Sequence, residues 1–456
     1  MSAGKLPEGW IESELSALGH IVTGKTPSTK QRSNFGGDIP FIKPGDLDLG
    51  GYIITTADTL TDEGLTLVPE LPANSIVVTC IGNLGKVGIT FKRSASNQQI
   101  NALIPSGKIN VKFVYYQILT LKPWLESQSA ATTIAIVNKS KFSQAPFKFP
   151  PISEQKIIAE KLDTLLAQVD GTKARLEQIP KILKRFRQAV LAAAVNGNLT
   201  ESWRRRKNFY LDKWDRSALS HIVKKIEAGK SLKCIETPPY EQQYGIIKIS
   251  AVTWGEYNEE ESKTLPDDSL FIESRRIAIG DFLISRANTL ELLGNPVIVK
   301  QVTKNLMLSD KVLRLVMADD DKPWVNIFLR SCYGRREIEF RSTGNQLSMR
   351  NIGQKALLEI PIPKPPIEEQ AEIVRRVEQL FAYADTIEKQ VNSALARVNN
   401  LTQSILAKAF RGELTAQWRA ENPQLISGEN SAAALLEKIK AEPAASTGKK
   451  ATRKKA

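Results

Sequence analysis

An internal repeat constrains this chain more than any other sequence feature. Pro150-Pro151-Ile152-Ser153-Glu154-Gln155 recurs as Pro365-Pro366-Ile367-Glu368-Glu369-Gln370, an offset of 215 residues. The match continues without a gap to Trp203-Arg204 in the first copy and Trp418-Arg419 in the second. A solenoid would repeat every ~20–50 residues. Two copies at this separation therefore indicate a duplicated half-molecule.

A more divergent region precedes each copy. Ala17-Leu18-Gly19-His20-Ile21-Val22 is echoed by Ala218-Leu219-Ser220-His221-Ile222-Val223, Gly24-Lys25 by Gly229-Lys230, and Ile42-Lys43 by Ile247-Lys248. This alignment puts His20 and His221 at equivalent places and indicates structural roles for both. We expect two variable domains, each followed by a constant segment. The expected divisions are 1–150 and 205–364 for the variable domains, 151–204 and 365–420 for the constant regions, and 421–456 for a short helix at Ala432–Lys440 with a disordered basic tail.

The constant segments have the period of paired helices. After each Pro-Pro, apolar residues recur in alternating steps of four and three, a pattern that leaves a stripe for a partner helix to cover. We expect two long helices packed as an antiparallel coiled coil with a pseudo-two-fold axis, roughly 60 Å long. Alternatively, each helix packs only on its own domain. Pro180 should kink or break the first helix. The predicted seam, which is also the predicted docking surface for partner subunits, is Ile158, Leu162, Leu165, Val169, Leu176 and Leu183 with Ile373, Val377, Leu380, Ile387, Val391 and Val398, and the second stripe continues to Leu401.

The variable domains have the pattern of mixed α/β structure. Short β-branched runs separated by Gly and Asn predict strands near 75–79, 87–91, 282–285 and 312–315, in a mostly irregular sheet. Helical stretches are expected at 112–121 and 325–333. The predicted fold class is α+β, with two tandem mixed α/β domains separated by the two long helices.

The formal charge of +14 suggests a polyanionic partner, although solubility is an equally good explanation of charge alone. Arg, Lys, Asn and Gln can read base edges, and several of them lie between the predicted strands. For any single residue a solvated loop is the more frequent explanation. The candidate DNA-binding residues are Lys43, Lys86, Lys92, Arg93 and Gln98 in the first domain and Arg275, Arg276, Arg286, Asn345, Gln346 and Arg350 in the second.

One motif points to another chemistry. Gly19-His20-Ile21-Val22-Thr23-Gly24-Lys25-Thr26 matches the phosphate-binding loop pattern. Ile21-Val22 look like a strand rather than a loop, however, and the second half of the chain loses the spacing. We therefore expect no nucleotide site. The two histidines and the separated Cys80, Cys234 and Cys332 predict neither a metal site nor a disulfide framework. The absence of a long apolar run or a signal peptide favours a cytoplasmic location.

Together these features resemble the specificity subunits (S, HsdS) of type I restriction–modification enzymes, most closely the enterobacterial K-type (IA) family. The resemblance rests on the opening, Met1 to Trp10, on Glu154 to Asp163, and on Gln370 to Gln379 with the run onward to Arg419. It covers the whole chain in layout and is loose in the variable domains.

The resemblance implies a non-catalytic subunit of a methyltransferase and endonuclease complex. Its variable domains would be target-recognition domains, each reading half of an asymmetric split DNA site. Its constant regions would dock two methylation (M) subunits, which methylate adenine at N6, and the full complex would add two restriction or motor (R) subunits. S-adenosylmethionine, ATP and Mg would enter through those partners and not through this chain, which would not be a homo-oligomer. The main alternative is a coiled-coil structural DNA-binding protein without enzyme partners, and a second is a phosphate-loop ATPase.

Overall fold

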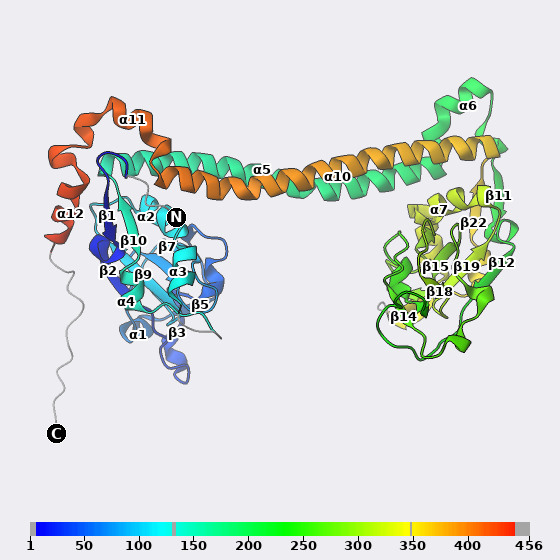
Figure 1. Ribbon diagram of the computed structural model, residues 1–456, viewed down its shortest axis with the longest axis horizontal. Helices are drawn as coiled ribbons and strands as arrows, with labels where there is room; N and C mark the ends of the chain where they lie inside the picture. The colour runs from blue at the N-terminus through cyan, green and yellow to red at the C-terminus, as the bar shows by residue number, and fades with distance from the viewer. Residues whose placement is uncertain (1–5, 130–133, 347–348, 443–456) are drawn as a thin grey trace. The chain divides into compact units, whose positions relative to one another are not determined.

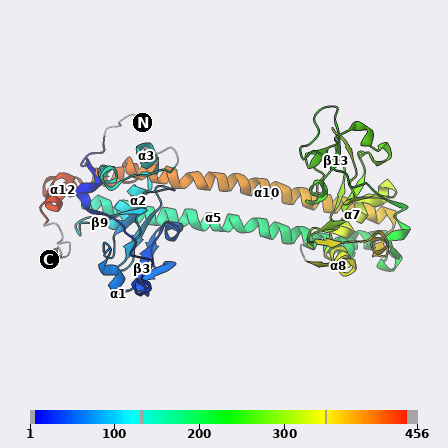
Figure 2. The ribbon, with the colours of Figure 1, turned by 90° about the horizontal axis from the view of Figure 1, so that it is seen from below.

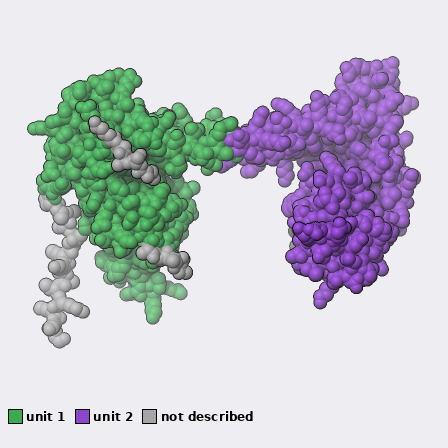
Figure 3. All heavy atoms as spheres, viewed as in Figure 1, with its two compact units in different colours: residues 1–176, 394–456 green, residues 177–393 purple. Residues whose placement is uncertain are grey.

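The computed structural model describes residues 6–129, 134–346 and 349–442 and divides the chain into two compact units (Figure 3). Unit 1 consists of residues 1–176 and 394–456, and unit 2 of residues 177–393. Two long helices contribute to both: α5 (Ile152–Val195) begins in unit 1 and ends in unit 2, and α10 (Ile367–Phe410) does the reverse. Each unit also carries a mixed α/β domain, which we call the first head (residues 11–149) and the second head (residues 215–364).

The first head is built on a five-stranded sheet in the order β2-β9-β6-β7-β4, a three-stranded sheet β5-β3-β8 and the pair β1-β10 (Figure 1). Its strands are β1 (Ile11–Glu14), β2 (Gly19–Thr23), β3 (Phe35–Ile42), β4 (Tyr52–Ile53), β5 (Asp58–Leu60), β6 (Ile76–Thr79), β7 (Val87–Thr90), β8 (Ala95–Ser96), β9 (Ile100–Pro105) and β10 (Pro146–Phe149). Its helices are α1 (Asp62–Thr66), α2 (Val111–Leu119), α3 (Lys122–Gln128) and α4 (Lys139–Ser143).

The second head repeats this order with β12-β19-β15-β17, β14-β13-β18 and β11-β22, and adds a small sheet β16-β21-β20. Its strands are β11 (Asp215–Ala218), β12 (Lys225–Ala228), β13 (Tyr244–Ile247), β14 (Ser262–Thr264), β15 (Phe282–Ser285), β16 (Ala287–Asn288), β17 (Pro296–Ile298), β18 (Asn305–Met307), β19 (Val312–Val316), β20 (Thr343–Gln346), β21 (Met349–Asn351) and β22 (Pro361–Lys364). Its helices are α7 (Lys322–Arg330), α8 (Cys332–Arg341) and α9 (Gln354–Leu358). The ordered sheets correct the expectation of mostly irregular ones.

Segments after the long helices complete the chain. α6 (Glu201–Lys207) follows α5, and α11 (Ala416–Glu421) follows α10. α12 (Ala432–Lys440) occupies the range in which the sequence predicts a short helix, and the expected basic tail beyond it lies outside the described residues. α5 does not end at Pro180, so the break that the sequence suggests there is absent.

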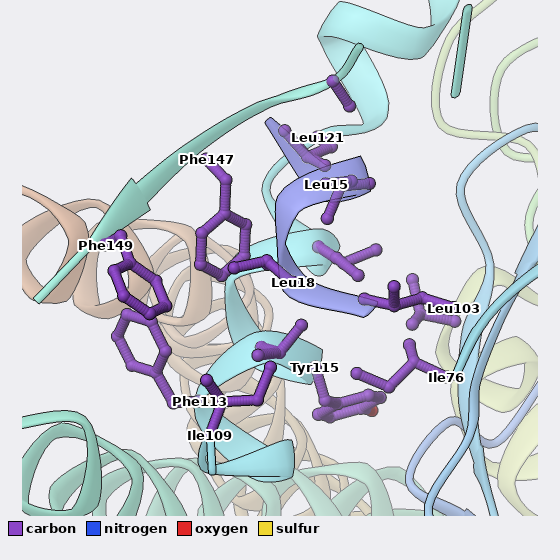
Figure 4. Packing of buried hydrophobic residues seen from close by; sticks show 14 of the residues in the cluster. Leu15, Leu18, Ile76, Leu103, Ile109, Phe113, Tyr115, Leu121, Phe147 and Phe149 are labelled. Atoms are coloured by element: carbon purple, nitrogen blue, oxygen red, sulfur yellow. The ribbon is translucent and has the colours of Figure 1, made fainter. Parts of the chain in front are cut away.

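In each unit the long helices pack into the hydrophobic core of the head. In unit 1, Ile158 and Leu162 of α5 and Phe410 of α10 share a cluster with Phe113 and Phe147 of the head, whose packing is shown in Figure 4. Phe113 lies edge-on to both Phe147 and Phe410, with ring centroids 5.9 and 5.6 Å apart. Burial of such large side chains stabilises each by about 1.5–3 kcal/mol, so the head and both helices form one core.

Polar contacts add to this packing in unit 1. Tyr116 of α2 donates its hydroxyl to Asp163 of α5 at 2.5 Å, and Lys112 reaches the same carboxylate at 2.6 Å. Burial, together with the hydrogen bond to Asp163, raises the pKa of Tyr116. Figure 2 shows α2 beside α5 in this unit. The first head is therefore held to α5 by ionic as well as apolar contacts.

In unit 2 the same two helices join the second head. Val190 and Leu191 of α5 and Ile373 and Val377 of α10 cluster with Trp324 of α7. Arg187 of α5 donates to Asp385 and Glu388 of α10 at 2.6 and 2.8 Å.

Candidate functional site

Two predicted DNA-binding lysines of the first head are held by acidic side chains. Lys43 follows β3, and its Nζ lies 2.5 Å from an Asp58 carboxylate oxygen. Lys86 precedes β7 and bonds the Asp48 carboxylate. Both lysines therefore brace the 3-10 turn at Pro44–Leu47 and its continuation. The structure gives them positioning contacts, and only part of each side chain faces solvent.

The other candidates of the first head are more exposed. Lys92 donates to the Asp38 carbonyl at 2.9 Å, and Arg93 pairs with Asp62 at 2.6 Å. Gln98 is exposed and accepts a hydrogen bond at 2.7 Å from the Thr26 hydroxyl. Exposed pairs of this kind exchange readily with water or a ligand. Lys92, Arg93 and Gln98 can therefore turn to a nucleic acid without leaving a buried charge.

In the second head, four of the six candidates meet on one small sheet. Arg286 stands directly before β16, and β16 pairs with β21, which contains Arg350. Asn345 and Gln346 lie on the adjacent β20, which completes the three-stranded sheet with Arg286 at its edge. Arg286 is exposed, and its side chain has no hydrogen bond or ion pair with the described residues. The sheet thus collects residues that are about sixty positions apart in the chain.

Three of the arginine candidates make contacts within the second head. Arg350 donates to the Ser342 and Gly344 carbonyls at 2.9 and 2.6 Å and so closes the β20–β21 hairpin. Arg276 pairs with Glu273 and lies 4.7 Å from the Phe271 ring centroid. The Arg275 backbone carbonyl accepts a hydrogen bond from the Leu308 amide. Arg350 and Arg276 therefore shape the surface, whereas Arg286 is available to a ligand.

The phosphate-loop pattern has a packing explanation. Gly19 to Thr23, which would form the loop, is strand β2 paired with β9. A Cβ on Gly24 would lie 2.1 Å from the Asn97 carbonyl oxygen, and one on Gly229 would lie 1.7 Å from that of Leu308. Both glycines are needed where the backbone crosses a neighbouring strand end closely, so the repeated Gly-Lys serves the fold of each head.

The structure corrects the equivalence of the two histidines. His20 lies within β2, whereas His221 ends a 3-10 turn. The backbone pairs Leu15 with Ala145 and Leu219 with Ile360, so Leu15 and Leu219 are the matching residues. The repeated letters around the histidines are therefore out of register with the fold.

Every predicted seam residue on α5 and α10 is buried or half-buried. The stripe on α10 departs from its predicted course near its end, because Leu401 is 46% exposed while Leu406 and Phe410 are buried. The last turns of α10 enter the core of the first head, and a helix that packs on a globular core follows a period nearer 3.6 than 3.5.

Unit 1 contains a buried polar cluster that was not among the sequence-based predictions. We call it the first lock (Trp10, Glu154, Gly412, Thr415 and Arg419). Trp10 Nε1 donates to Glu154 Oε2 at 2.8 Å. The Thr415 hydroxyl and Arg419 Nη1 both donate to Glu154 Oε1, at 2.6 and 2.5 Å. Arg419 Nη2 donates to the Gly412 carbonyl at 2.6 Å. The fully buried carboxylate thereby joins the start of the chain, α5 and the segment after α10.

Unit 2 contains the same arrangement, the second lock (Trp214, Glu369, Gly197, Thr200 and Arg204). Trp214 Nε1 donates to Glu369 Oε2 at 2.7 Å. The Thr200 hydroxyl and Arg204 Nη1 donate to Glu369 Oε1 at 2.7 and 2.5 Å, and Arg204 Nη2 to the Gly197 carbonyl at 2.6 Å. A buried carboxylate persists only when it is paired and hydrogen-bonded, and each lock meets both conditions.

The locks cross the two copies of the repeat. Glu154 could have paired with Arg204 of its own copy, but it binds Arg419 of the other copy, and Glu369 binds Arg204. The 215-residue offset contained the signal, since Glu154, Thr200 and Arg204 all recur at that distance. What the offset could not reveal is the exchange of partners.

Neither a metal site nor a membrane-spanning helix is found among the described residues. They contain no group of three or more His, Cys, Asp or Glu side chains that could hold a metal ion. Within the same residues, no helix has both the length and the apolar character required to cross a bilayer.

Comparison with known proteins identifies related chains. The family described as "Type I restriction modification DNA specificity domain" matches residues 7–181 and again 212–397. The type I restriction enzyme EcoKI specificity subunit of Escherichia coli K12 is 43% identical, and the StySPI specificity subunit of Salmonella potsdam is 39% identical; both alignments cover 100% of each chain.

Solved structures share the fold. A structure reported as the structural basis of complex assembly and conformational transition of the type I R-M system has a TM-score of 0.64 at 16% identity, with 90% of this chain and 100% of that chain covered. The HsdS subunit from Thermoanaerobacter tengcongensis has a TM-score of 0.57 at 17% identity, with 90% and 99% covered.

Proposed function

The chain belongs to the family of type I restriction–modification specificity subunits, in its K-type branch, and from this membership we propose how its parts share the work. Specificity subunits are the non-catalytic, DNA-recognising components of their enzymes. We propose that each head reads one half of an asymmetric, two-part DNA sequence. The observation that carries this proposal is a family domain matched twice, on two heads with one strand order and different loops.

The proposed organisation assigns one task to each region. Residues 1–150 and 205–364 are the two target-recognition domains, 151–204 and 365–420 the constant regions, and 421–456 a short helix with a basic tail. Arg286, beside the small sheet, supports base reading by the second head, because its exposed guanidinium has no partner among the described residues and bidentate arginine contacts to guanine are the commonest specific ones. In the first head, Lys92, Arg93 and Gln98 are the exposed counterparts.

We further propose that α5 and α10 pair antiparallel as a coiled coil with a pseudo-two-fold relation between the halves. Contacts in each unit support this: in unit 2, Arg187 toward the end of α5 pairs with Asp385 of α10, and Arg204 just beyond that end pairs with Glu369 at the start of α10. In unit 1 the start of α5, at Ile158, meets the end of α10, at Phe410. The two locks agree with this pairing, because each joins the start of one long helix to the segment that follows the other.

The constant surfaces are proposed to dock two methylation subunits, with two restriction or motor subunits in the full complex. S-adenosylmethionine for adenine N6 methylation, ATP and Mg would arrive with those partners, in the bacterial cytoplasm. The duplicated constant regions support this assignment, since two copies of one partner require two copies of one surface. The chain itself would enter the complex once.

A methylome tests the proposal. The chain is expressed with its methyltransferase subunit in a host without adenine methylation, and modified adenines are mapped by single-molecule sequencing. The expected result is one two-part motif with a fixed gap. An intact complex that methylates no such motif would overturn the proposal in favour of a structural DNA-binding protein, which would bind without sequence preference and with a steep salt dependence.

A further inference from the structure

Each head presents a large apolar side chain on the same turn. β3 ends at Ile42 and β13 at Ile247, and both are followed by a lysine and a 3-10 turn. The next exposed apolar side chain is Leu49 in the first head and Trp254 in the second; Leu49 is fully exposed and Trp254 is 76% exposed. A glycine with positive φ follows each of them, 64° at Gly50 and 84° at Gly255. The match places the two residues at equivalent positions, 205 residues apart.

The turn of the first head is fixed by hydrogen bonds. Asp46 accepts from the Lys43 amide at 2.7 Å and from the Ala57 amide at 3.0 Å. The Tyr115 hydroxyl accepts from the Gly51 amide at 2.8 Å, and Lys86 bonds Asp48. Leu49 therefore stands on an ordered turn. A partner that covers it gains apolar contact without having to order the backbone.

The turn of the second head is equally well held. Asn295 donates to the Thr253 carbonyl at 2.8 Å, and Asn288 donates to the Thr253 hydroxyl at 3.2 Å. Trp254 lines a cleft of about 720 Å³ with Lys184 of α5 and Arg330 and Arg336 of the head. None of these three cations makes a hydrogen bond or ion pair with the described residues. The cleft also contains Glu291 and Glu339, but the exposed indole has beside it three cations without a hydrogen-bonded partner among the described residues, and such cations suit a phosphate backbone.

The difference between the two residues indicates which partner covers them. Both locks keep the same residue types, as expected of buried clusters that serve the packing of the scaffold. Leu49 and Trp254 occupy one position but differ in size and chemistry. A surface that diverges between the halves fits a partner whose halves also differ, and that partner is the two half-sites of the DNA.

We propose that Leu49 and Trp254 are the apolar reading residues of the two heads, each packed against the bases of its own half-site. This inference rests on the proposed function and names residues within it. Apolar side chains read thymine methyl groups in the major groove or wedge between base steps in the minor groove. Arg330 takes a phosphate beside Trp254, and the larger ring makes the second head the more dependent on its apolar contact.

The test uses the complete complex of this chain with its methyltransferase. Trp254→Ala and Leu49→Ala are compared with Phe340→Ala, which removes an 82% exposed ring from α8, and Leu67→Ala, which removes a 45% exposed side chain beyond α1. Binding is measured to the cognate duplex and to duplexes with one half-site scrambled. Size-exclusion chromatography of every variant reports assembly with the methyltransferase.

Trp254→Ala is expected to weaken cognate binding about tenfold and to remove discrimination against a scrambled second half, while discrimination at the first half stays. Leu49→Ala should do the reverse by a smaller factor. Binding equal to that of the control variants, or loss of assembly instead of discrimination, overturns the inference. Failure of the wild-type complex to recognise any two-part site would instead overturn the proposed function.

Discussion

Tyr115 on α2 and Asn326 on α7 hold the same place in the two heads, five residues into matching helices, and they leave different surroundings. Tyr115 fills the space beneath the Leu49 turn and bonds it through Gly51. Asn326 lines a cleft of about 950 Å³, and its buried Oδ1 has no hydrogen-bond partner among the described residues. The two heads therefore differ at this helix position: the Tyr115 hydroxyl is bonded to the Leu49 turn in the first head, whereas Asn326 borders a cleft in the second.

The two locks, in contrast to Tyr115 and Asn326, are alike in the two units. Their residues match one for one, and so do the hydrogen-bond lengths around Glu154 and Glu369. The locks are thus closely repeated, whereas the surroundings of the Leu49 and Trp254 turns differ between the heads. The following experiments probe this contrast, in order of decreasing effect.

The locks should matter equally in the two units. Glu154→Ala and Glu369→Ala each remove the carboxylate that pairs with a buried guanidinium and accepts from an indole N–H, which should lower the free energy of unfolding by about 3–5 kcal/mol. Urea denaturation of the full chain measures the loss. Glu160→Ala, on an exposed position of α5, is the control. A loss confined to one lock would show that the two joints are not energetically equivalent.

The Arg187 ion pairs should stabilise the contact between α5 and α10 in unit 2. Arg187 pairs with Asp385 and Glu388, whereas the position 215 residues later is Thr402. A double-mutant cycle with Arg187→Ala and Glu388→Ala should yield a coupling of about 1 kcal/mol, since the pair is partly exposed to solvent. Zero coupling would mean that the Arg187–Glu388 pair adds nothing to the packing of the two helices in unit 2.

The support beneath the Leu49 turn should be measurable by itself. Tyr115→Phe keeps the ring and removes the hydroxyl that accepts from the Gly51 amide, at an expected cost of about 1 kcal/mol. Thermal denaturation gives the change, and hydrogen exchange at Gly51 should speed up. Unchanged exchange at Gly51 would mean that Asp46 and Lys86 hold the turn without Tyr115.

The smallest effect concerns acid stability. Hydrogen bonds from Arg375 and Arg376 lower the pKa of Glu372 from 4.5 to about 2, and the matching residue in the first copy is Ile157. A lowered carboxylate pKa contributes stability above pH 4.5 that disappears as the pH falls toward 2. Glu372→Gln should therefore lose a small part of the stability at pH 7 and show a shallower decline below pH 4.5. Parallel acid unfolding curves would contradict this assignment.

Much of the fold could be predicted from local pattern. β6, β7, β15 and β19 lie where the β-branched runs place them, and α5 and α10 follow the 4-3 stripes. The break expected at Pro180 is absent, because a proline removes one hydrogen bond from a helix of 44 residues that packing supports at both ends. The histidine echo misled because repeated letters need not share a register.

The candidate site was predicted less completely. Residue type alone proposed Arg286 and Arg350, but their meeting on one sheet depends on how β16 pairs with β21. Leu49 and Trp254 escaped notice because an apolar residue in a turn gives no sign of its exposure. Solvent contact is a property of packing, not of residue type.

The sequence by itself determined the duplication, the helical seam and the family, because periodicity and repeated motifs are written in the order of residues. Only the tertiary structure decided that Glu154 binds Arg419 rather than Arg204, and which basic residues remain free. Such pairings join residues hundreds of positions apart. They depend on which core surfaces bury each other, and no local pattern specifies that choice.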